Sequence, residues 1–299
     1  MRLPDFLIVG AMKSGTSTLR DLLTLRDDVF LPPGEVHFFS DERKYARGID
    51  WYASLFDAGA GAAAIGEKTP TYSYLPACAE RIHGHVPDAK LVWLFRDPVA
   101  RTYSHYWHSV KNGSERLSFR AAIQTEADRV ARDRWRGYQL RSMYHEQVER
   151  YLELFPRERM HFLLLEHLLR DPLGETNALL SFLGVEQLDA APVLPRSNRT
   201  FIPRSLNAQW AIRRIFRQRT RPYRLLSRLN RRPIAGYPRI EPAIREQLRD
   251  RFREPNQKLA RLTGLDLGIW DAPDRKAIVH GSESQGMSRA DPSRAVHSK

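Results

Sequence analysis

The sequence is poor in cysteine and has no long apolar run. Its 299 residues include one cysteine, Cys78, so neither an intrachain disulfide nor a cysteine-based metal cluster can form. No stretch approaches the roughly 18 apolar residues of a membrane-spanning helix. The first residues lead straight into a predicted strand, so we expect no signal peptide. These absences together favour a cytoplasmic protein.

Acidic residues are missing from one basic segment. Between Arg213 and Arg232 the chain has nine arginines and no aspartate or glutamate, and this segment carries much of the formal net charge of +13. Its arginines alternate with apolar residues, a pattern that favours a peripheral contact with an anionic membrane or with an anionic or lipid-borne acceptor. A solvated helix face is the alternative. No recognised nucleic-acid-binding module is present, so we expect no nucleic-acid partner.

Apolar runs alternate with amphipathic segments along most of the chain. The runs at 6–9, 91–95 and 160–166 predict buried strands, and residues 35–39 predict a short extended piece. Helices are expected over residues 16–23, 99–111, 118–155, 206–229 and 240–262. Strands alternating with helices predict an α/β fold: an open parallel sheet with helices on both faces.

Composition sets the expected domain limits. We predict a single domain over residues 1–271, with a basic helical segment at 205–232 inside it. Beyond residue 271 the chain is dominated by Asp, Pro, Ser, Gly and Arg, so residues 272–299 are predicted to be a disordered tail.

The stretch FLIVGAMKSGTSTLRDLL, residues 6–23, has the glycine spacing of a phosphate-binding loop. Gly10 and Gly15 are separated by four residues, and the backbone amides between them can face an anion at a helix N-terminus. The lysine that normally follows the second glycine is absent, and Lys13 lies inside the loop instead. No strand that ends in a suitable metal-binding aspartate accompanies the loop, so hydrolysis of nucleoside triphosphates is disfavoured.

Several charged residues follow predicted strands. Because parallel strands end at one edge of a sheet, we expect these side chains to gather there. They are Lys13, Glu67, Lys68, Arg96 and Glu166. Arg96 in LFRDPVARTYSHYWHS leaves its strand eight residues before Ser104, and arginine with a serine hydroxyl is a common phosphate-binding pair.

Four motifs in one order resemble those of the PAPS-dependent sulfotransferases. They are VGAMKSGTSTL, EVHFF, EKTPTY and LFRDPVARTYSHY. The similarity covers roughly residues 5 to 270 and is greatest to the heparan sulfate glucosaminyl sulfotransferase branch and its bacterial relatives. It implies the sulfotransferase fold, PAPS as sulfuryl donor and no required metal.

The resemblance also implies the donor-binding residues. Residues 13–17 with Thr18 nearby would bind the 5′-phosphosulfate, and Arg96 with Ser104 would bind the 3′-phosphate. Arg196 and Arg199 stand where such enzymes have a second donor-binding loop, although the usual Lys-Gly pattern is missing. The implied donor-binding set is therefore Lys13, Ser14, Gly15, Thr16, Ser17, Thr18, Arg96, Ser104, Arg196 and Arg199.

The sulfuryl transfer that the resemblance implies suggests catalytic roles for four residues. Lys13 can stabilise the charge that develops on the leaving phosphate, and Lys68 can supply a second positive group. Glu35 is the predicted general base, and His37, on the same side of an extended segment, orients it or the substrate. Two alternatives stay open here: Glu35 pairs with Lys44 or Arg43, or Glu67 is the base.

The acceptor is less constrained than the donor. The similar branch often has aspartate after EVHFF and arginine after the Gly-Thr pair, where this chain has Ser40 and Ser17. We expect a carbohydrate or glycolipid hydroxyl or amine as acceptor. A P-loop kinase with a rearranged lysine and a non-catalytic protein that binds polyanions or membranes are the two other functions considered.

Overall fold

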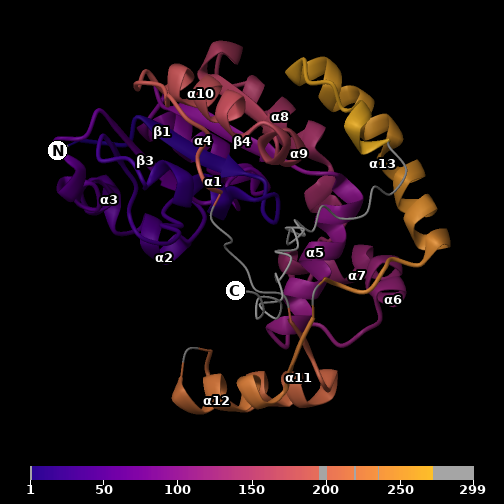
Figure 1. Ribbon diagram of the computed structural model, residues 1–299. Helices are drawn as coiled ribbons and strands as arrows, with labels where there is room; N and C mark the ends of the chain where they lie inside the picture. The colour runs from indigo at the N-terminus through magenta and orange to yellow at the C-terminus, as the bar shows by residue number, and fades with distance from the viewer. Residues whose placement is uncertain (1, 195–200, 219, 235, 272–299) are drawn as a thin grey trace, which may run out of the picture. The chain divides into compact units, whose positions relative to one another are not determined.

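A five-stranded parallel sheet forms the centre of the computed structural model, which describes residues 2–194, 201–218, 220–234 and 236–271. The strands lie in the order β2-β3-β1-β4-β5, and every neighbouring pair is parallel (Figure 1). Their bounds are Phe6–Gly10 (β1), Val29–Phe30 (β2), Ala64–Lys68 (β3), Lys90–Phe95 (β4) and Met160–Leu164 (β5). The predicted α/β class and parallel sheet are confirmed.

Helices cover both faces of this sheet because its strands are apolar on both sides. On one face, Ile8 and Leu94 pack in a core with Leu19 of α1 and with leucines of α9 and α10. On the other face, Trp93 meets Tyr151 of α8 with ring centroids 5.0 Å apart. The helices that pack on the two faces include α1 (Thr16–Leu23), α4 (Pro76–His85), α8 (Tyr144–Leu152), α9 (Leu165–Arg170) and α10 (Pro172–Leu183).

A second core lies beside the sheet. Helix α5 (Pro98–Lys111) packs there with α6 (Phe119–Gln124) and α13 (Pro242–Thr263) through Val110, Phe119 and Phe252. Residues 118–155 are mainly helical, as predicted, and 3-10 turns at Arg134–Arg136 and Leu140–Ser142 separate α7 (Glu126–Val130) from α8. Gly137, between the two 3-10 turns, is buried, and a Cβ there would lie 2.9 Å from the Tyr74 hydroxyl, so a side chain at this position would displace Tyr74.

Short elements join the main ones. Helices α2 (Glu42–Tyr45) and α3 (Gly48–Ser54) lie between β2 and β3, and further 3-10 turns are at Asp57–Gly59 and Arg157–Arg159. Contacts divide the chain into two units, 1–267 and 268–299. The described part of the second unit holds the 3-10 turn Gly268–Trp270. The predicted domain limit at 271 stays a prediction, and the predicted tail lies outside the described residues.

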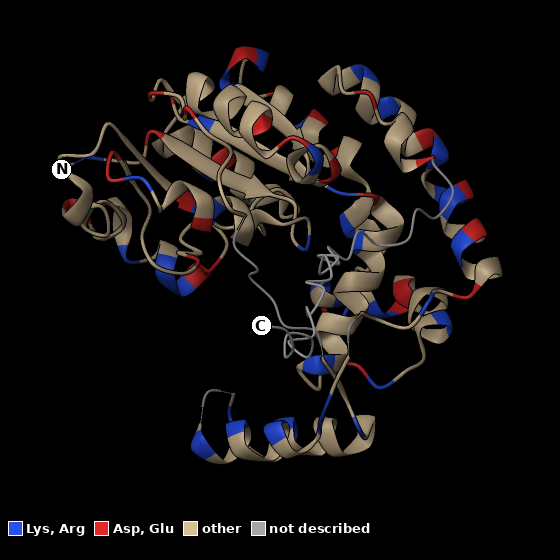
Figure 2. Ribbon diagram, viewed as in Figure 1, with Lys and Arg blue, Asp and Glu red and all other residues tan. Residues whose placement is uncertain are grey.

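The segment predicted as one helix over 206–229 is a helical hairpin on a β-neck. Helices α11 (Leu206–Ile215) and α12 (Arg221–Leu229) are flanked by β6 (Phe201–Pro203) and β7 (Arg231–Pro233), which pair antiparallel. The Asn230 side chain closes the neck, since its carbonyl accepts from the Ser205 amide at 3.0 Å. We call residues 201–233, apart from the undescribed residue 219, the basic arm. Figure 2 shows Lys and Arg on its helices and no acidic residue.

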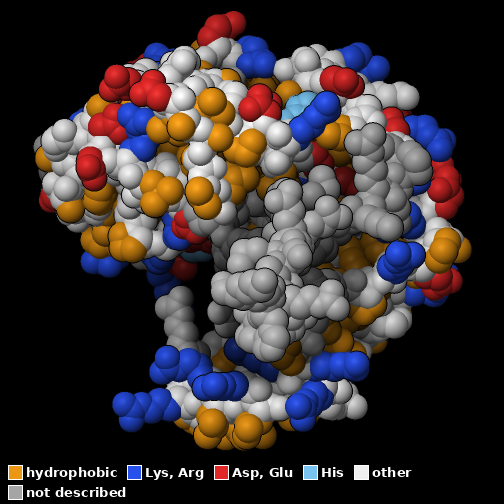
Figure 3. Space-filling model, viewed as in Figure 1, with side chains coloured by type: hydrophobic (Ala, Val, Ile, Leu, Met, Phe, Trp, Pro, Cys, Tyr) orange, Lys and Arg blue, Asp and Glu red, His pale blue; other side chains and the backbone are white. Residues whose placement is uncertain are grey.

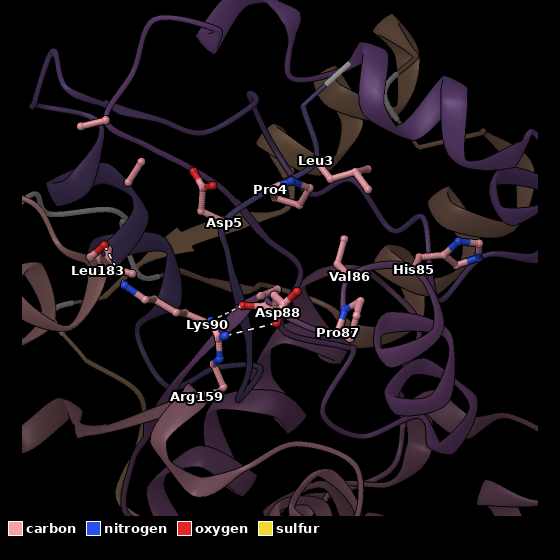
Figure 4. A pocket seen from close by; sticks show the side chains of 13 residues that line it. Leu3, Pro4, Asp5, His85, Val86, Pro87, Asp88, Lys90, Arg159 and Leu183 are labelled. Atoms are coloured by element: carbon pink, nitrogen blue, oxygen red, sulfur yellow. Dashed lines mark hydrogen bonds and ion pairs between the residues drawn. The ribbon is translucent and has the colours of Figure 1, made fainter.

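A cavity of about 510 Å³ lies at the amino ends of the strands. Residues that precede or begin β1 and β4, such as Asp5 and Lys90, line it (Figure 4). The Lys90 ammonium donates to the Leu183 carbonyl at 3.0 Å, and Arg159 pairs with Asp88 at 3.2 Å. These groups bind the protein itself, and the cavity is at the sheet edge opposite the charged residues predicted to act together.

Candidate active site

The loop between β1 and α1 is shaped by its two glycines. Gly15 has a φ of 96°, in the left-handed region, and a Cβ there would lie 2.7 Å from Leu165. A Cβ on Gly10 would lie 2.6 Å from the Ser73 hydroxyl. Gly15 also occupies the N-cap position of α1, without a side-chain cap. The backbone therefore curls at the carboxyl edge of the sheet, where the amide ends of a helix favour anions.

Lys13 lies at the centre of a group of positive charges. Lys13 is half-buried, and burial together with Lys111, Arg96 and Arg101 lowers the pKa of Lys13 to about 8. Arg96 donates to the Lys13 carbonyl at 3.4 Å, and Arg101 donates to the Met12 carbonyl at 3.4 Å. Like charges at such a site repel one another, so a polyanionic ligand relieves the repulsion.

Glu35 joins this positive region to two further predicted residues. Its carboxylate accepts from the Lys68 ammonium at 2.7 Å and lies 3.1 Å from Nε2 of His37. Burial acts to raise the pKa of Glu35, but the His37 hydrogen bond and the Lys68 charge outweigh it and lower that pKa to about 2. The structure thus brings the predicted base and both predicted assisting groups together. The ion pairs of Glu35 are with these groups and not with Lys44 or Arg43.

His37 reaches Glu35 by a different backbone route from the one predicted. The segment is not extended there, because His37 has a φ of 59° in the left-handed region. Its amide donates to the Thr69 hydroxyl at 3.2 Å, which holds this conformation. Its Nδ1 lies 3.2 Å from the Ser40 hydroxyl. With Ser40 donating to Nδ1, the Nε2 hydrogen is directed at the Glu35 carboxylate.

Glu67 supports the loop from inside the protein. It is fully buried and accepts hydrogen bonds from Tyr52 at 2.7 Å, Tyr72 at 3.0 Å and Thr69 at 3.1 Å. Burial raises the pKa of Glu67 to about 7, against the effect of these three hydrogen bonds. A carboxylate enclosed in this way has no access to a substrate. The alternative of Glu67 as base is therefore disfavoured. Glu67 instead holds the Thr69 hydroxyl, which in turn accepts from the His37 amide.

The remaining predicted donor residues lie in the loop before α1, on α1 and on α5. Ser14 and Thr16 are buried, Ser17 and Thr18 are half-buried at the start of α1, and Ser104 is half-buried on α5. Glu166 lies in α9 rather than at a strand end, and its carboxylate accepts from the Asp97 amide at 3.0 Å. Arg196 and Arg199 lie outside the described residues.

Comparisons with known proteins fit this arrangement. A family model described as "Sulfotransferase domain" matches residues 3–194. The chain belongs to the sulfotransferase family. Mouse (Mus musculus) heparan sulfate glucosamine 3-O-sulfotransferase 6 is 32% identical over 270 residues, covering 90% of this chain and 74% of the mouse protein. Mouse heparan sulfate glucosamine 3-O-sulfotransferase 3B1 is 29% identical over 271 residues, covering 90% and 65%.

A solved structure agrees with the fold of this sulfotransferase. The crystal structure of a sulfotransferase from Alicyclobacillus acidocaldarius is 29% identical, with a TM-score of 0.70, and the match covers 91% of this chain and all of the other. The predicted family, enzyme class and sulfuryl-transfer activity are confirmed, and the kinase and the non-catalytic alternatives are not supported.

The sulfotransferase family uses PAPS, and the charges described above fit such a donor. Lys13, Arg96 and Lys111 form a cationic group beside a glycine-shaped loop at a helix N-terminus. Burial, followed by the charges of Lys111, Arg96 and Arg101, lowers the pKa of Lys13, and the Glu35 carboxylate acts in the opposite direction. A donor with phosphate and sulfonate groups supplies negative charge that compensates these cations.

Sequence reasoning missed two residues on α5 that interact with Lys13. His108 and Lys111 follow Ser104 at spacings of four and seven, so all three share one helix face. Lys111 and His108 both interact electrostatically with Lys13. Burial and the charges of Lys13 and Lys111 lower the pKa of His108 to about 4, so its ring is neutral at pH 7. The helical spacing from Ser104 was a signal that could have identified both.

His105 of α5 packs inside the protein. His105 is buried against Tyr138, with ring centroids 4.8 Å apart, and burial lowers its pKa well below the usual value. Over the described ranges, no group of three or more His, Cys, Asp or Glu side chains is arranged to hold a metal ion.

Proposed function

We propose that this sulfotransferase moves the sulfuryl group of PAPS to a hydroxyl of a carbohydrate or glycolipid, with Glu35 as general base. The observation that carries the proposal is the contact of Glu35 with both Lys68 and His37, next to the cationic group around Lys13. The names of the mouse relatives specify O-sulfation of glucosamine in heparan sulfate, which favours a sugar hydroxyl over an amine.

The residues divide the work of an in-line displacement. PAPS, when bound, supplies an activated sulfuryl group on a phosphate leaving group. Glu35 accepts the proton of the attacking hydroxyl as the new sulfur–oxygen bond forms and the bond to the leaving phosphate breaks. Lys13 and Lys68 stabilise negative charge on the leaving and transferred groups. His37 holds the Glu35 carboxylate in place.

The ion pair with Lys68 tunes the base. A carboxylate with a pKa of about 2 is a weak base, and the Lys68 charge is one cause of that value. When Lys68 turns its charge to a bound sulfonate, Glu35 loses an ion pair and its basicity rises. Donor binding therefore prepares the base for the acceptor.

Donor binding by residues 13–18, Arg96 and Ser104 is part of this proposal, as is a reaction without a required metal. Arg196 and Arg199 remain predicted donor residues. The cytoplasmic location also remains a prediction. The membrane contact of residues 213–232 likewise remains a prediction.

Calorimetric titration with adenosine 3′,5′-bisphosphate, compared with ATP–Mg²⁺, tests donor class. We expect bisphosphate binding that is strongly weakened in Arg96→Ala. A control variant, Arg253→Ala, removes a charge from an exposed side chain of α13 and should bind as the parent does. ATP–Mg²⁺ binding without bisphosphate binding would overturn the proposal. Transfer of labelled sulfate from PAPS to a panel of oligosaccharides and glycolipids then identifies the acceptor.

A further inference from the structure

The basic arm exposes large apolar side chains to solvent. Leu225 and Leu229 of α12 are 60% and 65% exposed, and Ile215 at the end of α11 is 71% exposed. Leucine and isoleucine in a folded protein are usually covered, and single exposed ones need no explanation. Three on one short hairpin do need an explanation.

The apolar side of α12 is directed away from the contacts that anchor it. Ser227 is buried, and its hydroxyl accepts from the Gln209 side chain of α11 at 3.1 Å. Leu225 and Leu229 lie two residues before and after Ser227, and two residues correspond to about 200° around a helix. Both leucines are therefore on the side of α12 opposite its anchor.

Arginines border this apolar side. Arg221, Arg224 and Arg228 recur at spacings of three and four, so they form one row along α12, and all three are exposed. Acidic residues are absent from 213–232. In Figure 3, apolar side chains gather along one side of the arm with Lys and Arg beside them.

The arm is joined to the helix that carries active-site residues. Gln209 donates to the Lys111 carbonyl at 3.0 Å, and Arg213 donates to the Asn112 carbonyl at 3.3 Å. The Lys111 ammonium lies 4.9 Å from the ring centre of Phe201 in the neck. The arm is thus rooted at the end of α5, close to the group around Lys13.

We propose that the basic arm docks the protein on an anionic lipid bilayer, with Leu225, Leu229 and Ile215 in the headgroup region and the arginines against lipid phosphates and carboxylates. An amphipathic helix with a basic border lies in the plane of such a surface. In the described ranges no helix is both long and apolar enough to cross a bilayer, so the arm would lie on the surface.

Two other occupants match the arm less well. A soluble polyanion would use the arginines, but it gives no reason for three exposed apolar side chains. A second copy of the chain would cover the leucines, but it would bring two acid-free, arginine-rich arms together, and their charges repel. Anionic lipid satisfies both the apolar and the basic residues. This inference does not depend on the acceptor or on catalysis.

Flotation of the full-length protein with phosphatidylcholine vesicles, with and without phosphatidylserine, tests the proposal. We expect binding only to vesicles that contain phosphatidylserine. The double variant Leu225→Ser, Leu229→Ser should bind these vesicles at least about tenfold more weakly. A triple variant, Arg221→Gln, Arg224→Gln, Arg228→Gln, should lose binding similarly and reduce its salt dependence. The matched control is Leu25→Ser, Leu169→Ser, because these leucines are 69% and 53% exposed outside the arm.

Each other outcome overturns the proposal. No binding to phosphatidylserine vesicles excludes lipid docking. Binding that needs the arginines but not the leucines indicates a polyanion site, which heparin chromatography would support. A dimer that the leucine variant abolishes, measured by light scattering, indicates self-association.

The affinity of the same variants for adenosine 3′,5′-bisphosphate, measured by calorimetry, should be unchanged. This control separates the test of the arm from that of the donor site.

Discussion

Raising the pH should weaken donor binding through Lys13. The pKa of this ammonium is about 8 in the free protein, lowered by burial and by Lys111, Arg96 and Arg101. Bound phosphates favour the charged form, so the pKa of Lys13 rises on binding, and affinity is full well below pH 8 and declines as the pH rises through 8. With a pKa of about 8, the charged fraction falls about eightfold between pH 7.5 and 9, and affinity for adenosine 3′,5′-bisphosphate should fall by the same factor.

Calorimetry across this pH range, in buffers of different ionisation enthalpy, measures both the affinity and the proton uptake. Lys13→Arg keeps the charge at every pH tested and should flatten the profile, because arginine does not deprotonate in this range. Burial also lowers the pKa of Lys111, so Lys111→Arg is the necessary second control and should leave most of the slope in place. An affinity that is constant from pH 7.5 to 9, or a slope unchanged by Lys13→Arg, would refute the reasoning.

Three further changes test the proposed base Glu35, the contact of Thr69 with His37, and the turn at Gly15. Glu35→Gln should lower turnover by roughly 10²–10⁴-fold while bisphosphate affinity stays nearly constant, and a rate near that of the parent would exclude this base. Thr69→Val removes the hydroxyl that accepts from the half-buried His37 amide and should cost about 1–3 kcal/mol in thermal unfolding and up to about 100-fold in turnover. The control Thr71→Val, also buried but with no side-chain hydrogen bond among the described residues, should retain activity; equal loss in both would refute this role. Gly15→Ala should destabilise the protein by about 1–3 kcal/mol more than Gly48→Ala, because both have positive φ but only Gly15 has a neighbour in the way of a Cβ. Equal unfolding midpoints would contradict this.

The carboxyl edge of the sheet was predictable from sequence because its signals are local. An apolar run followed at once by a charged residue marks a strand end, which placed Lys68 and Arg96 correctly. The strand predicted over 160–166 shows the limit of this rule: Leu165 continues the apolar run past the end of β5 into α9, and apolar residues at a strand–helix junction do not reveal where the strand stops.

Other parts of the site depend on contacts distant in sequence. The left-handed φ of His37 is held by Thr69, 32 residues away, and Thr69 is in turn bound to buried Glu67. No local pattern in EVHFF encodes such a contact, so the predicted extended conformation was wrong although the pairing of Glu35 with His37 was right. In the sequence, Ser40 stands out only because the similar branch often has aspartate at this position. In the structure, its hydroxyl contacts the His37 ring.

Helix α5 connects the donor site to the basic arm, and this connection bears on which acceptor the enzyme meets. Lys111 is electrostatically coupled to Lys13, while its ammonium lies over Phe201 and its carbonyl accepts from Gln209. If the arm lies on a lipid surface, the end of α5 is held close to that surface together with the cationic group that it helps to form. An acceptor carried on lipid would then be concentrated near Glu35, whereas a free oligosaccharide would gain nothing from docking. Phosphatidylserine vesicles should therefore raise the rate only for the lipid-borne acceptor, and the leucine variant of the arm should remove that increase while leaving the rate with a free acceptor unchanged.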